Sequence, residues 1–536
     1  MLAGFAGWVL ALLAALGLIL LLTWRFRASR PLTWIIPPAS IALFWLDMKV
    51  FEILGAHLYS PIVLEPLNNP GVGREIDLGT ATLISLALAS VALVLVQVLA
   101  YRWLPRRVGW RTGMLSGSTA LVVGVAGVLL FLPTRAVGAN GFLRSALPFS
   151  DMSRIPPLDR TLGRPGIPGA RLEGPLPPKI LLLAVESLRH DAFNSGLMPG
   201  LTALTDGLRC SWSARHYAGG HTTEYGVFSL LYGAESFQYP LFARDAARSP
   251  YLEALRERGY LIEAASASAL LEWNDAAFIP ANFDRYSEHL DGTGWEGDIA
   301  VAEFVSERMA QPGKRFVMGF LNATHHNYAY PPQFEGVTPV LPVDYDHFAS
   351  DATLAESALE IRNRYVNSAR FVDHTLTTLL ESLARLIRSG ELVVVITGDH
   401  GEEFFEHGLL GHAAPTFTEE RIRVPLVVCG GPDPGRRIAR STHRDIWALI
   451  QGRPPRPSPI IIGGLDFPFG NRTAVVITDR TKHHLELCGT RQKLCLVETH
   501  TTTLRDAPAP DALRLTAAEL DRVTARIETG LYFPLP

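Results

Sequence analysis

Long apolar runs dominate the first 132 residues of the chain. Three of them come close to the about 20 apolar residues that a helix needs to cross a bilayer. These three are residues 3–24, 81–101 and 114–132. A fourth run, residues 34–54, is interrupted by two prolines and carries three charged side chains, so it either spans the bilayer or lies in its interface. The pattern predicts a bundle of four, or three, transmembrane helices within residues 1–133.

Arginine clusters beside these runs predict how the chain crosses the membrane. One cluster follows the first run, at residues 25–30, and a larger one lies between the last two runs, at residues 102–111. The positive-inside rule places such clusters in the cytoplasm. With four spans, everything after Leu132 then lies outside the cytoplasm. With three spans the two clusters cannot both be in the cytoplasm, and the residues after Leu132 still lie outside if the larger cluster sets the direction of the last span. The first run lacks a basic start and a small-residue cleavage site, so we interpret it as an anchor and not as a cleaved signal peptide.

Shorter apolar runs follow the membrane part. Residues 134–178 are rich in Pro, Gly and Arg and predict an extended linker. The short apolar runs are residues 180–185, 392–397 and 424–429. A helical pattern covers residues 358–389, and Gly390 ends it as a C-cap would. Strands buried on both faces read as continuous apolar runs, so the pattern predicts an α/β sandwich with a mostly parallel sheet.

The soluble part is predicted to have two portions, a catalytic domain over residues 179–470 and a C-terminal subdomain over residues 471–536. In the second portion, residues 478–497 alternate between apolar and polar side chains, which predicts a hairpin. Residues 516–528 have the spacing of an amphipathic helix. We expect this portion to pack on the catalytic domain.

Composition and charge narrow the function classes. The chain has 536 residues, 48% of them hydrophobic, with a mean hydropathy of +0.17, which fits lipid-embedded segments on a globular core. The net charge of −3 gives no indication of nucleic-acid binding. None of the four cysteines forms a CxxC pair, which argues against a zinc knuckle or a redox motif. Cys488 and Cys495 are either a disulfide, in an oxidising compartment, or two free thiols.

Candidate metal ligands follow two of the predicted strands directly. Glu186 comes after the first strand, and Asp399 and His400 come after the strand at residues 392–397. In parallel sheets, ligands bind beyond the carboxyl ends of strands, so these three side chains are expected to meet there. Two carboxylates and an imidazole suit Mn²⁺ or Zn²⁺. Taken singly, each residue is also typical of a helix start or a solvated turn, and the joint pattern is what indicates a site.

Two adjacent threonines offer a nucleophile for the same site. Thr222 and Thr223 lie in a turn of small residues between the two strands. A hydroxyl is a weak nucleophile until a metal or a base lowers its pKa, and a neighbouring divalent ion would do so. Threonines near glycines are otherwise ordinary turn residues.

Seven stretches in this order resemble the alkaline phosphatase superfamily, in its sulfatase-like branch, and most of all its lipoteichoic acid synthase and phosphoglycerol transferase group. The stretches are LLLAVESLRHDAF, MPGLTAL, HYAGGHTTEYGVFSLLYG, THHNYAYPPQF, RYVNSARFVDHTL, VVVITGDHGEEFFEHGLLGH and EERIRVPLVV. They run from about residue 179 to residue 431. The resemblance implies an alkaline-phosphatase-like catalytic domain behind a membrane anchor.

The resemblance also implies roles for single residues. Metal ligands would be Glu186, Thr222, Asp399 and His400, holding one divalent ion, Mn²⁺ or Zn²⁺, with Mg²⁺ or Ca²⁺ as further alternatives. Thr222 would also form a covalent phosphothreonine, with Thr223 as the alternative nucleophile.

Three more residues receive roles from the same resemblance. His325 falls at the family's H-x-P-Y position, although Asn327 replaces the usual proline, and His412 follows the second glycine-rich turn. Both would bind the phosphate or protonate the leaving group, and Arg189 would contact the phosphate less directly. True sulfatases share a C/S-x-P-x-R motif, and this chain has His-Thr-Thr-Glu-Tyr at the corresponding place, which argues against sulfate-ester chemistry.

The expected function is a membrane-anchored transferase. It would move a phosphoglycerol or similar phospho-alcohol group from a membrane phospholipid to a glycan or lipid acceptor outside the cytoplasm. The predicted location is the cytoplasmic (inner) membrane, with several spans and a periplasmic catalytic domain. Three alternatives stay open: a phosphoethanolamine transferase, a phosphodiester hydrolase, and a non-catalytic lipid-binding regulator. The sequence does not give the oligomeric state.

Overall fold

The computed structural model describes residues 162–167, 170–270, 276–290, 294–345, 351–412, 416–456, 459–464, 473–487 and 494–532. The predicted transmembrane runs and the start of the linker lie outside these residues. Within the described residues, no helix combines the length and the apolar character that crossing a membrane requires. Residues 170–178 form no helix or strand, and the backbone oxygens of Leu172 and Gly174 accept hydrogen bonds from Arg258 of the soluble domain.

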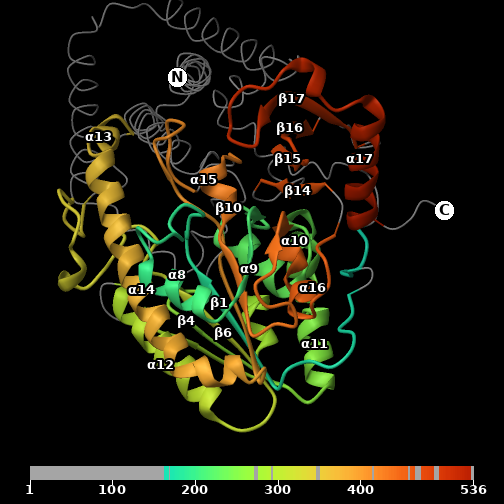
Figure 1. Cartoon of the computed structure of the whole chain (residues 1–536). Coiled ribbons are helices and arrows are strands. Elements are labelled where there is room, and N and C mark those ends of the chain that lie inside the picture. The colour runs from blue at the N-terminus through green and yellow to red at the C-terminus, as the bar shows by residue number, and fades with distance from the viewer. Residues whose placement is uncertain are drawn as a thin grey trace, which may run out of the picture. The chain divides into compact units, whose positions relative to one another are not determined.

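An eight-stranded sheet forms the centre of the domain (Figure 1), in the order β12–β2–β11–β7–β1–β6–β4–β5. Its strands are β1 (Lys179–Val185), β2 (Ser211–Ser213), β4 (Leu261–Ser266), β5 (Arg285–Glu288), β6 (Arg315–Leu321), β7 (Leu392–Gly398), β11 (Leu426–Cys429) and β12 (Arg437–Ile438). The five strands from β7 to β5 are mutually parallel. The mostly parallel sheet is thus as predicted, but the third apolar run, in β11, pairs antiparallel to β7. A continuous apolar run reports burial on both faces and carries no information on direction.

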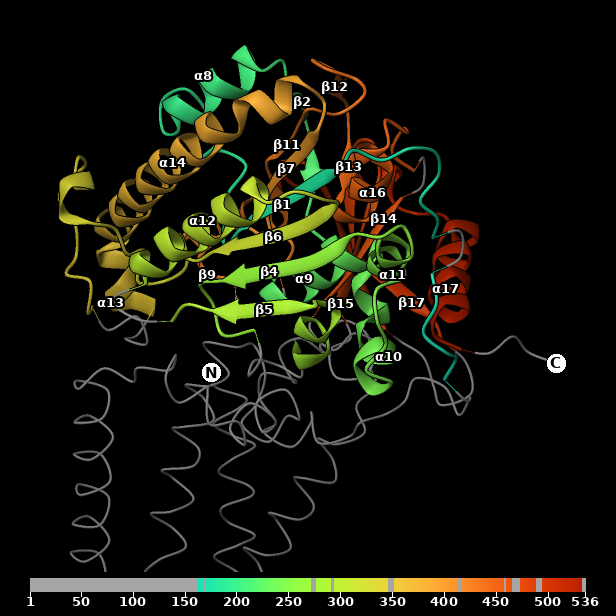
Figure 2. The same ribbon diagram turned by 90° about the horizontal axis from the view of Figure 1, so that it is seen from below.

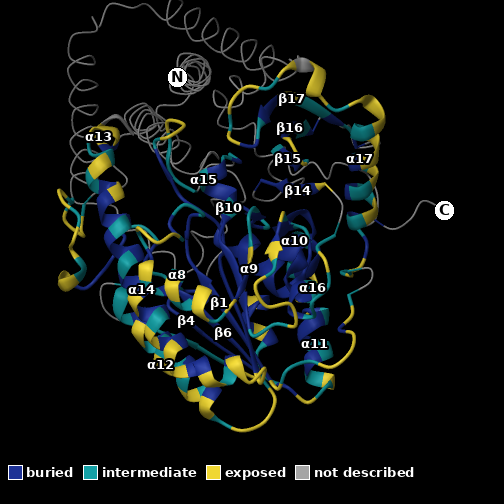
Figure 3. Cartoon of the chain, viewed as in Figure 1, coloured by how far each residue is buried: buried dark blue, intermediate teal, exposed yellow. Residues whose placement is uncertain are grey.

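Helices cover both faces of this sheet (Figure 2). One layer holds α8 (Pro199–Gly207), α12 (Trp295–Ala310) and α14 (Ala358–Arg388). The other holds α9 (Thr223–Tyr232), α10 (Tyr239–Arg244), α11 (Pro250–Glu257) and α16 (Ile446–Ile450). The side chains of β1 alternate between the two layers, because Ile180, Leu182 and Ala184 join one core cluster and Leu181, Leu183 and Val185 join the other. Figure 3 shows the sheet as buried throughout its centre, which explains the continuous apolar runs of β1 and β7.

The C-terminal portion is a four-stranded antiparallel sheet with one helix. Its strands are β14 (Ile460–Gly463), β15 (Thr473–Ile477), β16 (Thr481–Leu487) and β17 (Leu496–Thr503), followed by α17 (Ala517–Leu531). The predicted hairpin corresponds to β16 and β17. The predicted helix is α17, which Thr516 and Glu519 start with a reciprocal capping box.

Smaller elements complete the chain around the carboxyl end of the large sheet. They are β3 (His216–Tyr217), β8 (Glu403–Phe404), β9 (Leu410–Gly411), β10 (Arg423–Val424), β13 (Ser441–Thr442), α13 (Asp351–Glu356) and α15 (Glu419–Ile422). A disulfide joins Cys210, just before β2, to Cys429 at the end of β11. Cys495 is disulfide-bonded as well, while Cys488 lies outside the described residues. No sequence pattern indicates the Cys210–Cys429 pair, because 219 positions separate the two residues.

Candidate metal centre

Neighbouring strands bring the predicted ligands together. β1 and β7 are adjacent and parallel, with Val185 opposite Gly398, so the next residues, Glu186 and Asp399, leave the sheet at the same edge. His400 Nε2 lies 3.0 Å from Glu186 Oε1 and 3.3 Å from Asp399 Oδ2. All three side chains are buried. The prediction that these three residues converge agrees with the described geometry.

Backbone groups orient Asp399. Its Oδ1 accepts hydrogen bonds from the backbone N–H groups of Ser187, at 3.0 Å, and His400, at 2.8 Å. Ser187 adopts a left-handed backbone with φ of 56°, which turns its N–H toward the carboxylate. The other oxygen, Oδ2, is buried and accepts no hydrogen bond from the described residues, although His400 Nε2 lies 3.3 Å away. A buried carboxylate oxygen that accepts no hydrogen bond is costly unless a cation meets it.

The structure brings Thr223, and not Thr222, into this cluster. Thr223 Oγ1 lies 3.0 and 3.1 Å from the two carboxylate oxygens of Glu186 and 3.3 Å from His400 Nε2. Thr222 is the N-cap residue of α9, and its buried hydroxyl has no hydrogen-bond partner in the described part of the chain. The contacts therefore favour Thr223, the alternative that the sequence left open, as the hydroxyl beside the metal ligands.

The N-terminus of α9 adds a favourable field at this hydroxyl. Thr223 is the first residue of the helix, where the aligned peptide dipoles present a partial positive charge. Such an end stabilises an anionic oxygen or a phosphate group. The first turn of the helix also touches the ligand loop, because a Cβ added to Gly226 would lie 2.4 Å from the backbone oxygen of Asp399.

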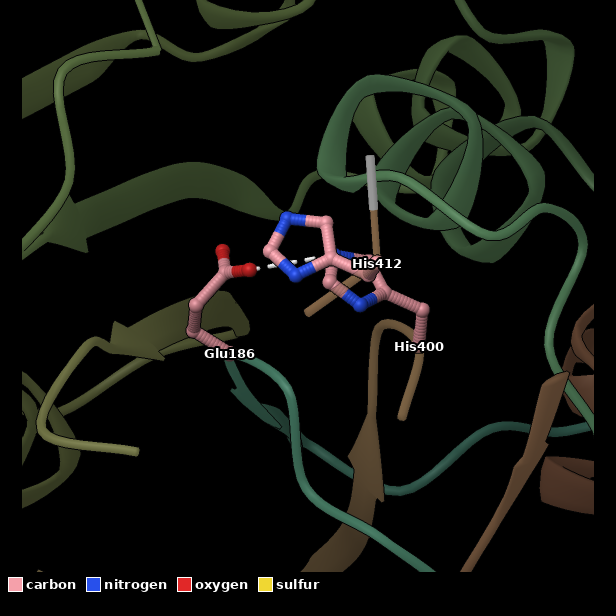
Figure 4. Close-up of side chains that lie close together, drawn as sticks. All are labelled: Glu186, His400 and His412. Atoms are coloured by element: carbon pink, nitrogen blue, oxygen red, sulfur yellow. Dashed lines mark ion pairs between the residues drawn. The ribbon is translucent and has the colours of Figure 1, made fainter. Parts of the chain in front are cut away.

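His412 joins the cluster from the segment after β9. One ligand atom each from Glu186, His400 and His412 lie within 4.8 Å of one another, and Figure 4 shows these three side chains converging. His412 Nδ1 lies 2.7 Å from Glu402 Oε2, and Tyr328 donates its hydroxyl to the other Glu402 oxygen at 2.8 Å. With Nδ1–H donated to Glu402, the lone pair of His412 is on Nε2.

His325 lies close to His412, and their ring centroids are 5.5 Å apart. Burial lowers the pKa of His325 to about 4, so the ring is neutral at neutral pH. A neutral imidazole can donate or accept a hydrogen bond, but it is a poor source of a proton. His325 is thus better suited to binding a phosphate oxygen than to protonating a leaving group.

The guanidinium of Arg189 is engaged elsewhere, contrary to the expected phosphate contact. It pairs with Asp191 at 2.8 Å and with Glu406 at 2.7 Å, and it donates to the backbone oxygen of Glu402 at 3.0 Å. These bonds hold the segment that carries Glu402. His407, from the same segment, also points elsewhere, because its Nε2 contacts Glu420 at 3.0 Å.

The charges of the central residues are strongly coupled. Burial opposes ionisation of Glu186, but the charge of His400 outweighs it and lowers the Glu186 pKa to about 2. The pKa of His400 rises to about 10, because Asp399 and Glu186 outweigh the opposing effect of burial. Burial and the charge of Glu186 raise the pKa of Asp399. Two carboxylates thus compete for one proton on an imidazole, and a divalent ion fits this donor set better than a proton does.

His443 connects the two backbone segments that carry the ligands and the nucleophile. Gly219 N–H donates to His443 Nδ1 at 3.1 Å, so Nδ1 carries no proton, and Nε2–H donates to the backbone oxygen of Gly398 at 3.0 Å. Gly398 directly precedes Asp399, and Gly219 lies in the loop that leads to Thr223. Burial lowers the pKa of His443 to about 3, which keeps it in this neutral form.

Glu402, Tyr328 and His443 are not among the site residues that the sequence predicts. Glu402 and Tyr328 lie inside the motifs GDHGEEFFEHG and THHNYAYPPQF, so these motifs already indicate that the two residues are near the site. His443 lies in a stretch with no recognised pattern.

Comparisons with known proteins give a consistent assignment. The family described as Sulfatase matches residues 178–447 of the chain. An uncharacterized protein of Haemophilus influenzae is 24% identical over 277 residues, which are 51% of this chain but only 40% of that relative's length.

Two solved structures extend the comparison. The integral membrane lipooligosaccharide phosphoethanolamine transferase A (EptA) of Neisseria meningitidis superposes with a TM-score of 0.51 at 15% identity, covering 78% of this chain and 83% of that chain. A protein in the alkaline phosphatase superfamily from Vibrio parahaemolyticus gives a TM-score of 0.46 at 16% identity, covering 67% and 87%. The similarity to EptA is one of fold.

Proposed function

Since the chain belongs to the sulfatase family, and so is a sulfatase-like phosphotransferase or hydrolase of the alkaline phosphatase superfamily, we propose that it transfers a phospho-alcohol group from a membrane phospholipid through a phosphothreonine on Thr223. The observation that carries this proposal is the position of Thr223 Oγ1, 3.0 Å from Glu186 and 3.3 Å from His400 at the start of α9. A hydroxyl held between a carboxylate and an imidazole is set for nucleophilic attack.

The ligand set proposed for one divalent ion is Glu186, Asp399, His400 and the Thr223 hydroxyl, with His412 within reach. When bound, such an ion lowers the pKa of the hydroxyl and offsets the charge of the phosphate. The imidazole ligand His400 suits Mn²⁺ or Zn²⁺ better than Mg²⁺ or Ca²⁺.

The chain's own residues account for two steps. Thr223 Oγ1 bonds to phosphorus, the bond from phosphorus to the diacylglycerol oxygen breaks, and the alcohol leaves with a proton. In the second step an acceptor hydroxyl bonds to phosphorus and the bond to Thr223 breaks. His325 lies where it can bind a phosphate oxygen, and His412, whose ring centroid is 5.5 Å away, lies where it can relay these protons. The electric field at the start of α9 favours the charge that develops at Thr223.

The proposed donor head group is phosphoglycerol, on the strength of the sequence motifs. Phosphoethanolamine is the second candidate, because EptA, whose fold this domain shares, is a phosphoethanolamine transferase by its description. The proposed acceptor is a glycan or lipid hydroxyl, with water as acceptor in a hydrolase. The Cys210–Cys429 disulfide supports a catalytic domain in an oxidising compartment outside the cytoplasm, and the apolar runs before residue 133 support an anchor in the cytoplasmic membrane.

Intact-mass analysis of the full chain, purified with native lipid, tests the proposal. We expect a covalent adduct whose mass names the transferred group and which peptide mapping assigns to Thr223. The same preparation should hold about one equivalent of divalent metal. A protein that carries no metal and forms no adduct with any phospholipid would be a lipid-binding regulator instead.

A further inference from the structure

A cavity lies beside β2, and the loop after Glu186 forms one of its walls. Its volume is about 310 Å³, within the range of about 300–1,000 Å³ that is usual for ligand sites. Residues of α8, β2 and the start of β11 form the other walls. It continues into a shallow basin, because Ala214 and Arg423 line both spaces. None of the proposed catalytic residues lines either space. We call the two together the basic cavity, after the residues Arg215, Arg423 and Arg437 that line it.

Positive charge dominates this lining. Asp206 is the acidic residue that lines the cavity, against the three arginines. Arg423 pairs with Glu419 at 3.3 Å. Arg215 and Arg437 form no ion pair with any residue that the structure describes. Guanidinium groups that line a cavity and form no ion pair are suited to a carboxylate or a phosphate.

An exposed aromatic ring adds a flat apolar surface. Trp212 is 43% exposed and lines the cavity, and the guanidinium of Arg437 lies 5.3 Å from its ring centroid. An exposed tryptophan that is held by an arginine can accept the C–H face of a sugar ring against the negative face of its π system.

Polar groups of the walls could bind hydroxyls. The Nδ1 atom of His190 is buried and has no hydrogen-bond partner among the described residues, and Thr202 and Ser213 also line the cavity. Burial lowers the pKa of His190 to about 4, so its ring acts as a neutral donor or acceptor.

We propose that the basic cavity binds an acidic oligosaccharide, with a sugar ring on Trp212, hydroxyls on the polar wall and an acidic group on Arg215 and Arg437. A nucleic acid fits less well, because tracking a phosphate backbone needs a longer row of cations than three arginines provide. The proposal does not depend on the transfer reaction, since the two sites share no residue. An occupant would contact the loop that begins at Glu186, through His190.

Calorimetric titration of the full-length protein in detergent tests this site. The probes are trigalacturonic acid, its neutral counterpart maltotriose, and a hexathymidylate. We expect saturable binding of the acidic sugar, weaker binding of the neutral one, and loss of affinity by about tenfold or more in Trp212→Ala and in the Arg215→Gln/Arg437→Gln double variant. If Trp212→Ala does not fold, the Arg215→Gln/Arg437→Gln double variant still tests the site.

Two controls separate this site from others. Arg480→Gln removes an exposed arginine from the turn between β15 and β16 and should leave binding unchanged. Thr223→Ala should also bind normally, because the catalytic site is not involved. No saturable binding of the acidic sugar at about 10 mM, or equal binding by the cavity variants, would overturn the proposal. Tighter binding of the oligonucleotide through the same residues would replace it with a nucleic-acid site.

Discussion

Thr222 and Thr223 differ by one position in the chain, yet only one hydroxyl meets the metal ligands. Thr222 is the N-cap residue with an extended backbone and Thr223 is the first residue of α9, so their side chains leave the chain in different directions. Thr223 Oγ1 contacts Glu186 and His400, while the hydroxyl of Thr222 finds no partner among the described residues.

Substituting each threonine in turn tests this assignment. Thr223→Ala should lower kcat by at least about 10³-fold and abolish the covalent adduct, because the attacking oxygen is gone. Thr222→Ala keeps that oxygen and should retain most of the activity. Turnover of a chromogenic phosphodiester and intact mass are the measurements. The reverse pattern, with the adduct lost only in the Thr222 variant, would restore the assignment that the sequence favoured.

The carboxylate of Glu402 is expected to act through His412. Its hydrogen bond at 2.7 Å fixes which nitrogen of the imidazole faces the cluster. Glu402→Gln should therefore weaken metal affinity or activity by about 10- to 100-fold, with the fold unchanged. Tyr328→Phe removes one hydrogen bond to the same carboxylate but leaves the bond between Glu402 and His412, so it should cost less. Metal titration of both variants tests this role. If the two residues only supported packing, both variants would have a lower melting temperature, and metal affinity would not fall more in Glu402→Gln than in Tyr328→Phe.

Metal binding should depend on pH through His400. The metal-free pKa of His400 is raised to about 10, so its imidazole carries a proton at neutral pH and must lose it to become a ligand. Affinity should therefore rise with pH by up to about tenfold per unit through the neutral range, and level off near the raised pKa. Calorimetry in two buffers of different ionisation enthalpy would show about one proton released per metal ion. Uptake of protons on binding would contradict this sign.

At the scale of elements, the two adjacent strands β1 and β7 explain why the meeting of the metal ligands could be predicted from the sequence. Their apolar runs were long enough to recognise, and their parallel pairing places Glu186 beside Asp399 and His400. The direction of β11 and the choice between two threonines could not be read in the same way, because burial patterns do not encode direction and a helix start is not located to one residue. His443 was missed because its role lies in two backbone contacts far apart in the sequence.

Substitutions of His443 test whether it positions these elements. Gln can replace the Nε2 donor to Gly398, and Asn can replace the Nδ1 acceptor of Gly219, whereas Leu can do neither. We expect metal affinity to fall by about tenfold or more in His443→Leu, and the Gln variant to recover more of it than the Asn variant, because Gly398 is next to Asp399. If all three variants lose affinity only in proportion to their loss of stability, His443 is a packing residue.

At the scale of the whole molecule, the Cys210–Cys429 disulfide joins segments that are 219 positions apart. Closing so long a loop removes much entropy from the unfolded chain. By chain entropy alone, this raises the free energy of unfolding by about 5 kcal/mol. The Cys210→Ser/Cys429→Ser variant should therefore melt at a clearly lower temperature than the wild type. Calorimetric melting with and without reductant checks this, and equal melting temperatures would show that the bond does not stabilise the domain.

The close contact of Gly226 with the backbone of Asp399 limits how this enzyme can be altered. There is no room for a methyl group between α9 and the ligand loop, so nucleophile and ligands form one rigid unit that cannot be retuned piece by piece. For the proposed transfer reaction, we expect selection between head groups to reside in segments free of that constraint, such as the turn around His325 and the loop from Glu402 to His412. Engineering a new donor preference should then change the residues that flank His325 and His412 and leave these two histidines and Glu402 in place.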